Sequence, residues 1–141
     1  MRFETKADLD RETKCIQFFC NKFGLTYVKL DENDVDFSLH KDGQLIAFAE
    51  VKGRNKNISD AYPLPIACRK LVKLVDKKTN PVVIWDCFDG IIYGKVELIA
   101  GNLRIGGRKP RENSVNDIEL MAYYDKSAEL KEIFLYKSIN D

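Results

Sequence analysis

The chain has 141 residues, of which 45% are hydrophobic and 32% charged, which is enough for one globular domain around a single core. Because the net charge is only +1, any affinity for nucleic acid has to come from local basic patches. No apolar run approaches a membrane span and the N-terminus does not read as a signal peptide, so we expect a cytoplasmic protein with no membrane partner. Four scattered cysteines and one histidine argue against structural zinc and against a cysteine–histidine or serine–histidine hydrolase.

Residues 8 to 23 are predicted to form a helix that begins at Asp8 as the N-cap and ends at Gly24. Its apolar stripe consists of Leu9, Ile16, Phe19, Cys20 and Phe23. Glu12 falls within this stripe, so its carboxylate is expected to point inward, where it needs a partner or a metal. The alternative is a first-turn glutamate that is favoured by the helix dipole.

Residues 33 to 54 follow a predicted strand at 25 to 30 and contain two runs of alternating apolar residues around Asp42-Gly43, a hairpin signal. The apolar positions are Val35, Phe37, Leu39, Leu45, Ala47, Ala49 and Val51. Both runs bury the same face only if the connection has an odd number of residues or contains a β-bulge. That register also places Asp36 beside Glu50 and Lys52.

Asp36, Glu50 and Lys52 interrupt the apolar pattern and together offer metal chemistry. Carboxylate oxygens suit Mg²⁺, which needs only one or two of them besides water and substrate phosphate oxygens. A neighbouring lysine can orient or help deprotonate a water and offset charge on a phosphate. The competing interpretation is a solvent-exposed strand with a cross-strand ion pair, and Asp34 is a rival for the role of Asp36.

Asp36 followed by Glu50-Val51-Lys52 resembles the signature of the PD-(D/E)xK nucleases, the restriction-endonuclease-like superfamily, although Val35 stands where the motif has proline. The resemblance implies that Asp36 and Glu50 bind Mg²⁺ or Mn²⁺, that the Val51 carbonyl joins them and that Lys52 assists the attacking water. It also implies that Glu12 on the first helix completes the metal site, directly or through water.

The middle of the chain continues the order of elements of that superfamily. After a polar loop at 53 to 57, in which Arg54 is a candidate phosphate contact, a helix is predicted at 64 to 78 and strands at 82 to 88 and 91 to 98. The helix is expected to bury an apolar stripe of Ala67, Leu71, Leu74 and Val75, and it bears a basic side in which Lys70 and Lys73 are candidates for nucleic-acid contact. The resemblance implies that a lysine or glutamine of this helix contacts the site, a role open to Lys70 or Lys73. Helix, three strands, helix and strand give the α-β-β-β-α-β core of the restriction-endonuclease-like α/β fold, with a mixed sheet flanked by helices.

The C-terminal part is predicted to add a basic loop at 101 to 117, a strand at 118 to 124 and a helix at 127 to 136 capped by Asp125 or Ser127. The loop contains candidate phosphate-binding residues, namely Arg104, Arg108, Lys109 and Arg111. No second domain or repeat is evident, so we expect one domain over 1 to 141 with its core at about 8 to 98.

These patterns predict a metal-dependent endonuclease that hydrolyses phosphodiester bonds in nucleic acid, with DNA as the favoured substrate. The resemblance adds a homodimer as an expectation. Two alternatives stay open: a catalytically inactive nuclease-fold module for DNA binding or assembly, and a structural or inhibitory protein whose basic loop meets an acidic protein partner.

Overall fold

The structure of the protein, a computed structural model, describes residues 5–107 and 118–135. The helices are α1 (Lys6–Phe23) and α2 (Cys68–Asp76), with short 3₁₀ turns at Ile58–Asp60 and Val96–Leu98. The strands are β1 (Thr26–Lys29), β2 (Phe37–Lys41), β3 (Gln44–Gly53), β4 (Leu64–Ala67), β5 (Pro81–Cys87), β6 (Gly90–Lys95), β7 (Asn102–Gly107), β8 (Ile118–Tyr124) and β9 (Lys131–Phe134). No helix in these two stretches is long and apolar enough to cross a membrane.

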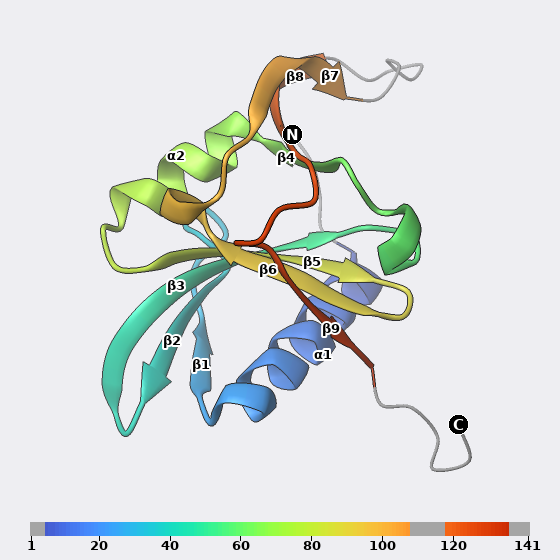
Figure 1. The fold of residues 1–141 in the computed structure, drawn as a ribbon. Coiled ribbons are helices and arrows are strands. Elements are labelled where there is room, and N and C mark those ends of the chain that lie inside the picture. Colours follow the sequence, from blue (N-terminus) through green and yellow to red (C-terminus); the bar gives the residue numbers. More distant parts are fainter. Residues whose placement is uncertain (1–4, 108–117, 136–141) are drawn as a thin grey trace, which may run out of the picture.

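A six-stranded mixed sheet in the order β1-β2-β3-β5-β6-β9 forms the centre of the fold (Figure 1). Strands β3 and β5 run parallel, and every other neighbouring pair in this sheet is antiparallel. A parallel pair needs a long crossover connection, which here contains β4 and α2. A second, antiparallel sheet has the order β4-β8-β7. The predicted α/β class with a mixed sheet and the α-β-β-β-α-β order is therefore confirmed, with β4 inserted before the second helix.

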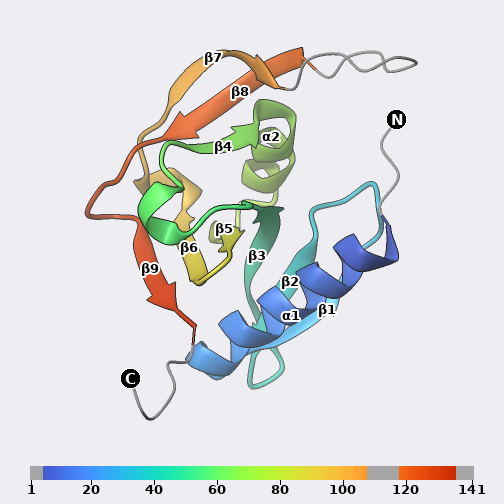
Figure 2. The same cartoon turned by 90° about the vertical axis from the view of Figure 1, so that its right-hand side faces the viewer.

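The central sheet is covered on both faces, as the two perpendicular views show (Figures 1 and 2). Helix α1 packs on one face over a cluster that includes Ile16, Phe19 and Ile84. Helix α2 and the small sheet pack on the other face over a cluster that includes Trp85. A strand buried on both faces has apolar residues at successive positions, which accounts for the continuous apolar run of β5.

Helix α1 begins one turn earlier than the sequence predicted. Thr5 is the N-cap: its side chain accepts a hydrogen bond from the backbone N–H of Asp8, and the Asp8 carboxylate accepts one from the backbone N–H of Thr5. Asp8 is therefore the third helical residue of a capping box and not the cap, because either residue type can start a helix and only the backbone geometry decides between them. The helix ends, as predicted, at Gly24 in the left-handed conformation.

The β2–β3 hairpin has a two-residue turn at Asp42-Gly43, with φ of 51° and 80°, and a β-bulge. Leu39 pairs with Ala47 and His40 with Leu45, which leaves Ile46 as the extra residue. The prediction of an odd connection or a bulge is confirmed in its second form. Exceptions to the predicted shared face are Leu45, which is 45% exposed, and Val35, which joins the core under α2.

Three predictions for the second half of the chain are wrong. Residues 64 to 67 form β4 and not the first turn of a helix, because Pro65 biases Leu64 toward an extended backbone and Leu64 and Ile66 are both buried. Residues 102 to 107 form β7 and not part of a loop, since they pair with β8. The predicted helix at 127 to 136, with its cap at Asp125 or Ser127, is replaced by β9, which pairs with the otherwise open edge of β6.

Candidate active site

Asp36 lies immediately before β2, at the point where β3 runs on beyond its partner strand. Phe37 pairs with Ala49, so the residues of β3 from Glu50 onward have no partner in β2. The Asp36 carboxylate takes the place of that partner: its Oδ2 accepts a 2.8 Å hydrogen bond from the backbone N–H of Val51. Asp36 is only 7% exposed, and the structure thus brings it to the Glu50-Val51-Lys52 segment, as the hairpin argument predicted.

Glu50 is more deeply buried, at 4% exposure. Its Oε2 lies 3.6 Å from Nζ of Lys70 on α2, whereas its buried Oε1 has no hydrogen-bond donor among the described residues. Burial, followed by the negative charge of Asp36, raises the pKa of Glu50 to about 8, although the ammonium of Lys70 partly offsets the shift. A carboxylate with an unsatisfied buried oxygen lowers the stability of the fold, and a bound cation or a proton at Glu50 would relieve this cost.

Glu12 reaches the same place from α1, and a lysine of β1 lies between it and Asp36. The Nζ of Lys29 is 3.5 Å from Oε1 of Glu12 and 3.4 Å from Oδ1 of Asp36. The Glu12 side chain is 12% exposed, in keeping with the predicted inward orientation. The site therefore draws its charged groups from α1, β1, β3, α2 and the segment before β2.

Lys52 follows Glu50 by two positions near the end of β3, so it projects from the same face of the strand. Val51, between them, packs toward the core under α1. This alternation places one carboxylate and one amine side by side at the end of a strand that is paired with β5 and, from Glu50 onward, has no partner in β2. Lys52 thus stands where it can act on a group bound at Glu50.

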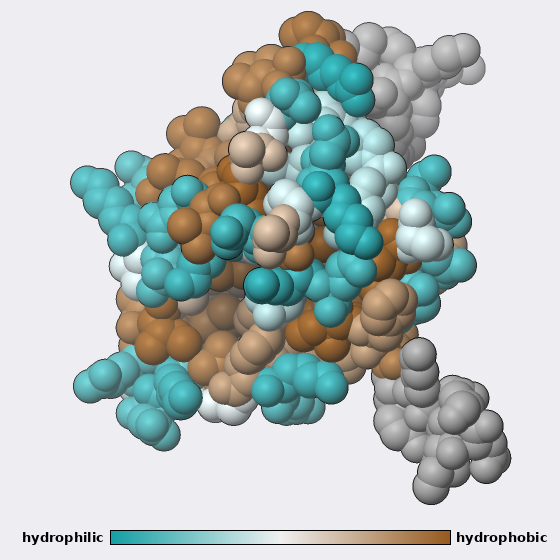
Figure 3. Space-filling view, viewed as in Figure 1, coloured by the Kyte–Doolittle hydropathy of each residue, from teal (hydrophilic) through white to brown (hydrophobic). Residues whose placement is uncertain are grey.

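Helix α2 turns its lysines toward the site and not outward. Besides Lys70, Lys73 donates to the Asn33 carbonyl at 3.2 Å, and Lys77 lies 2.6 Å from Oδ1 of Asp34. The opposite side of the helix exposes Val72 and Val75, and Figure 3 shows apolar surface over α2. Of the predicted apolar stripe, Ala67 and Leu74 are buried, whereas Val75 is exposed. The basic side is not directed to solvent, because Lys70, Lys73 and Lys77 contact Glu50 and the segment that leads to Asp36.

The remaining candidate nucleic-acid residues are dispersed. Arg54 turns inward: its guanidinium donates to the carbonyls of Ala61 and Pro63, at 2.9 and 3.4 Å, and so holds the loop before β4. Arg104 is exposed on β7, with its guanidinium 4.0 Å from the ring centroid of Tyr123. Three further candidates, Arg108, Lys109 and Arg111, lie outside the described residues.

The donor set at this site fits a hard divalent cation. Carboxylate oxygens are the ligands that Mg²⁺ and Mn²⁺ prefer, and the unsatisfied Oε1 of Glu50 is available. Within residues 5–107 and 118–135, no three histidine, cysteine or acidic side chains are grouped closely enough to hold a metal ion by themselves. An ion here would be held by few protein oxygens together with water and substrate, which is how Mg²⁺ is commonly bound.

Sequence reasoning missed Lys29, and it left open whether Lys70 or Lys73 is the α2 residue that contacts the site. The signal for Lys29 was present: an antiparallel strand before β2 places a residue opposite Phe37, next to Asp36, and that residue is Lys29. Predicting Lys29 from this signal requires the register of β1 with β2, and the alternating pattern of the β2–β3 hairpin does not define that register. On α2, Lys70 contacts Glu50 whereas Lys73 donates to the Asn33 carbonyl, and the spacing of the two lysines does not distinguish them.

A mixed sheet with an acidic pair and a lysine at the end of a central strand defines a protein of the restriction-endonuclease-like class. The family model described as "Phage putative PDDEXK endonuclease" matches residues 1–131. The chain therefore belongs to this family. Comparison with curated proteins gives no match, and neither does comparison with solved structures.

Proposed function

We propose that this protein is a divalent-metal-dependent endonuclease that hydrolyses phosphodiester bonds, with DNA as its substrate. The observation that carries the proposal is the pairing of buried Asp36 and Glu50 at the end of β3, with one Glu50 oxygen left without a hydrogen-bond donor among the described residues. Membership of the PDDEXK endonuclease family supports the same reaction. A buried acidic pair of this kind costs stability, and a bound cation would recover it.

Asp36 and Glu50 are the proposed metal ligands, with the ion Mg²⁺ or Mn²⁺, and Glu12 is proposed to complete the site directly or through a water. The Val51 carbonyl is proposed to join them, because N–H and C=O of one strand residue point the same way and the Val51 N–H points at Asp36. When bound, the ion would lower the pKa of a coordinated water and neutralise charge on the scissile phosphate. The hydrogen bond from Val51 fixes the orientation of the Asp36 carboxylate before any ligand arrives.

Lys52 is the proposed residue that positions the attacking water. Its ammonium stands on the same face of β3 as Glu50, so it can hydrogen-bond a water at that carboxylate and offset the charge that develops on the phosphate. Lys70 and Lys73 line the α2 side of the site and are proposed to meet the phosphates that flank the cleaved bond. For Arg54 that role competes with its bonds to the loop carbonyls.

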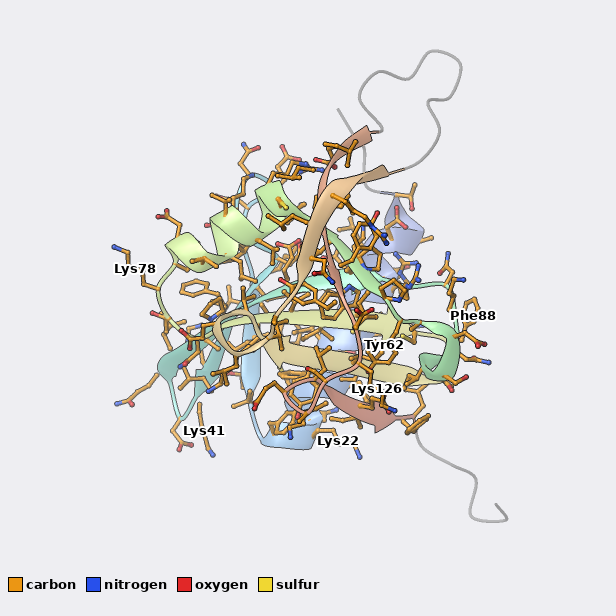
Figure 4. All side chains as sticks on the ribbon, turned by 45° about the horizontal axis from the view of Figure 1, so that its top comes forward. Lys22, Lys41, Tyr62, Lys78, Phe88 and Lys126 are labelled. Atoms are coloured by element: carbon orange, nitrogen blue, oxygen red, sulfur yellow. The ribbon has the colours of Figure 1, made fainter. Side chains whose placement is uncertain are left out.

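The test is cleavage of labelled linear duplex, single strand, branched junction and RNA with Mg²⁺, with Mn²⁺ and with EDTA. The informative variants are Asp36→Asn, Glu50→Gln and Lys52→Met, which keep side-chain volume and remove charge. The matched control is Lys41→Met: Lys41 lies at the tip of the β2–β3 hairpin, far from the site (Figure 4). We expect each site variant to lose at least about 100-fold in rate, and the control to cut like the wild type.

Cleavage that persists in EDTA, or in either carboxylate variant, would refute the proposal. Salt-sensitive binding to duplex DNA without cleavage would instead support the inactive nuclease-fold binding module. The homodimer is a separate proposal, which rests on the family resemblance. Size-exclusion chromatography with light scattering tests it by measuring the molar mass, and the mass of a monomer would contradict it.

A further inference from the structure

Lys29 of β1 bridges two carboxylates that come from different elements. Its Nζ lies 3.5 Å from Oε1 of Glu12 and 3.4 Å from Oδ1 of Asp36. The backbone supports this placement, because Lys29 pairs with Phe37 across β1 and β2 and the next N–H, that of Leu30, donates to the Asp36 carbonyl. The register of the sheet therefore fixes the backbone of Lys29 beside that of Asp36, within reach of both carboxylates.

The two oxygens of Asp36 are used in different ways. Oδ2 accepts a hydrogen bond from the backbone N–H of Val51, so the oxygen with more capacity left for a metal is Oδ1, which faces Lys29. The ammonium of Lys29 and a divalent ion would thus approach the same oxygen of Asp36, and two cations at such a short distance repel each other. A lysine in this position neutralises the carboxylates in the absence of metal and opposes metal when it arrives.

We propose that Lys29 is a positioning residue that acts as an internal counter-ion: it holds Glu12 and Asp36 together before metal binds and competes with the ion for their oxygens, so that it sets the metal affinity. The inference rests on the proposed function. The lysine can withdraw toward solvent, since its side chain is 38% exposed, and in the bridging position its Nζ also lies 5.0 Å from the ring centroid of Phe37.

The test is the affinity for Mn²⁺ alone, measured by titration calorimetry without nucleic acid. Lys29→Met should bind Mn²⁺ about tenfold more tightly than the wild type, because the competing charge is gone. Lys29→Arg should bind Mn²⁺ no more tightly than the wild type, since a guanidinium pairs with carboxylates at least as strongly as an ammonium does. Lys41→Met removes the same charge at the hairpin tip and should leave the affinity unchanged, which separates the local bridge from net charge.

A second readout needs no metal. In EDTA, Lys29→Met should lower the midpoint of urea denaturation when it is introduced into the wild type. The same substitution should lower the midpoint by less in a Glu12→Gln/Asp36→Asn background, because the two carboxylates that Lys29 neutralises are absent there. Three results would overturn the role of Lys29 without contradicting the proposed nuclease function. They are Mn²⁺ binding by Lys29→Met that is no tighter than that of the wild type, Mn²⁺ binding by Lys29→Arg that is tighter, and equal losses of urea midpoint in the two backgrounds. Absence of Mn²⁺ binding in every variant, wild type included, would refute the metal site itself and this inference with it.

Discussion

Glu50 is the residue in which stability and the proposed chemistry oppose each other most directly. It is buried, close to a second carboxylate and only partly offset by Lys70. A glutamine of the same shape would remove the charge and keep most of the packing. Such a site is retained at a cost in stability, which is the usual relation between an active site and the fold that holds it.

The Glu50 pKa predicts how the metal-free protein responds to pH. The pKa of Glu50 is about 8 in the folded protein and near 4.5 in the unfolded chain, so folding takes up a proton when the pH lies between these two values. The free energy of unfolding therefore falls as the pH rises from about 4.5 to about 8. We expect a loss on the order of a few kcal/mol between about pH 5 and about pH 9 in EDTA. Glu50→Gln should flatten this slope and be the more stable protein at the alkaline end, as urea denaturation at several pH values would measure.

Lys41→Met is the control for that series, because it changes net charge without touching the carboxylates. The same slope in Glu50→Gln as in the wild type would show that another group titrates. Added Mg²⁺ should also flatten the slope of the wild type, since a bound cation replaces the proton at Glu50.

At the scale of elements, the β2–β3 hairpin is where local sequence and structure agree most closely. Its turn needs positive φ at both central residues, and Gly43 provides one of them without steric cost. A Cβ built on Gly43 would meet no atom within 4 Å, so only backbone strain opposes a larger residue there. The turn lies at the opposite end of the hairpin from Asp36 and Glu50.

Gly43→Ala should therefore lower the unfolding free energy by about 1 kcal/mol and leave the cleavage rate of the folded protein unchanged. Asp42→Asn is the matched variant at the neighbouring position, and it should be neutral or slightly stabilising because asparagine tolerates this conformation well. Urea denaturation and a cleavage assay below the transition measure the two effects. A loss of activity in a folded Gly43→Ala protein would mean that the register at the site depends on the turn.

The elements that sequence analysis predicted correctly are those whose pattern is local. The alternation around Asp42-Gly43 and the apolar run of β5 each reflect burial that neighbouring residues share. The wrong predictions concern β4 and β9, whose residues pair with strands about 55 and 40 positions away in the chain, and β7, which pairs with β8. At the site, Asp36 and Glu50 follow from the hairpin, whereas Lys29 depends on strand register and Lys70 on which side of α2 meets the sheet, and neither is encoded by spacing.

At the scale of the whole molecule, positive charge is divided between an inner and an outer group. The lysines of α2 and Lys29 are committed to carboxylates and carbonyls around the site. Arg104 stands apart on the β7–β8 ribbon, which extends from the body of the protein (Figure 1), exposed and stacked on Tyr123. With a net charge of +1, affinity for a phosphate backbone has to come from local basic residues, and Arg104 is an exposed candidate besides Lys70 and Lys73.

Arg104→Ala should consequently weaken binding to duplex DNA and reduce the slope of log affinity against log salt by about 1, because one phosphate contact and its released counterion are lost. The measurement is fluorescence anisotropy between about 50 and 200 mM salt, in a Glu50→Gln background that does not cut. Lys41→Met in the same background should leave the slope unchanged, since its charge lies at the hairpin tip. Equal slopes for Arg104→Ala and its parent would place the ribbon outside the path of the nucleic acid and restrict phosphate contact to the rim that α2 forms around Glu50.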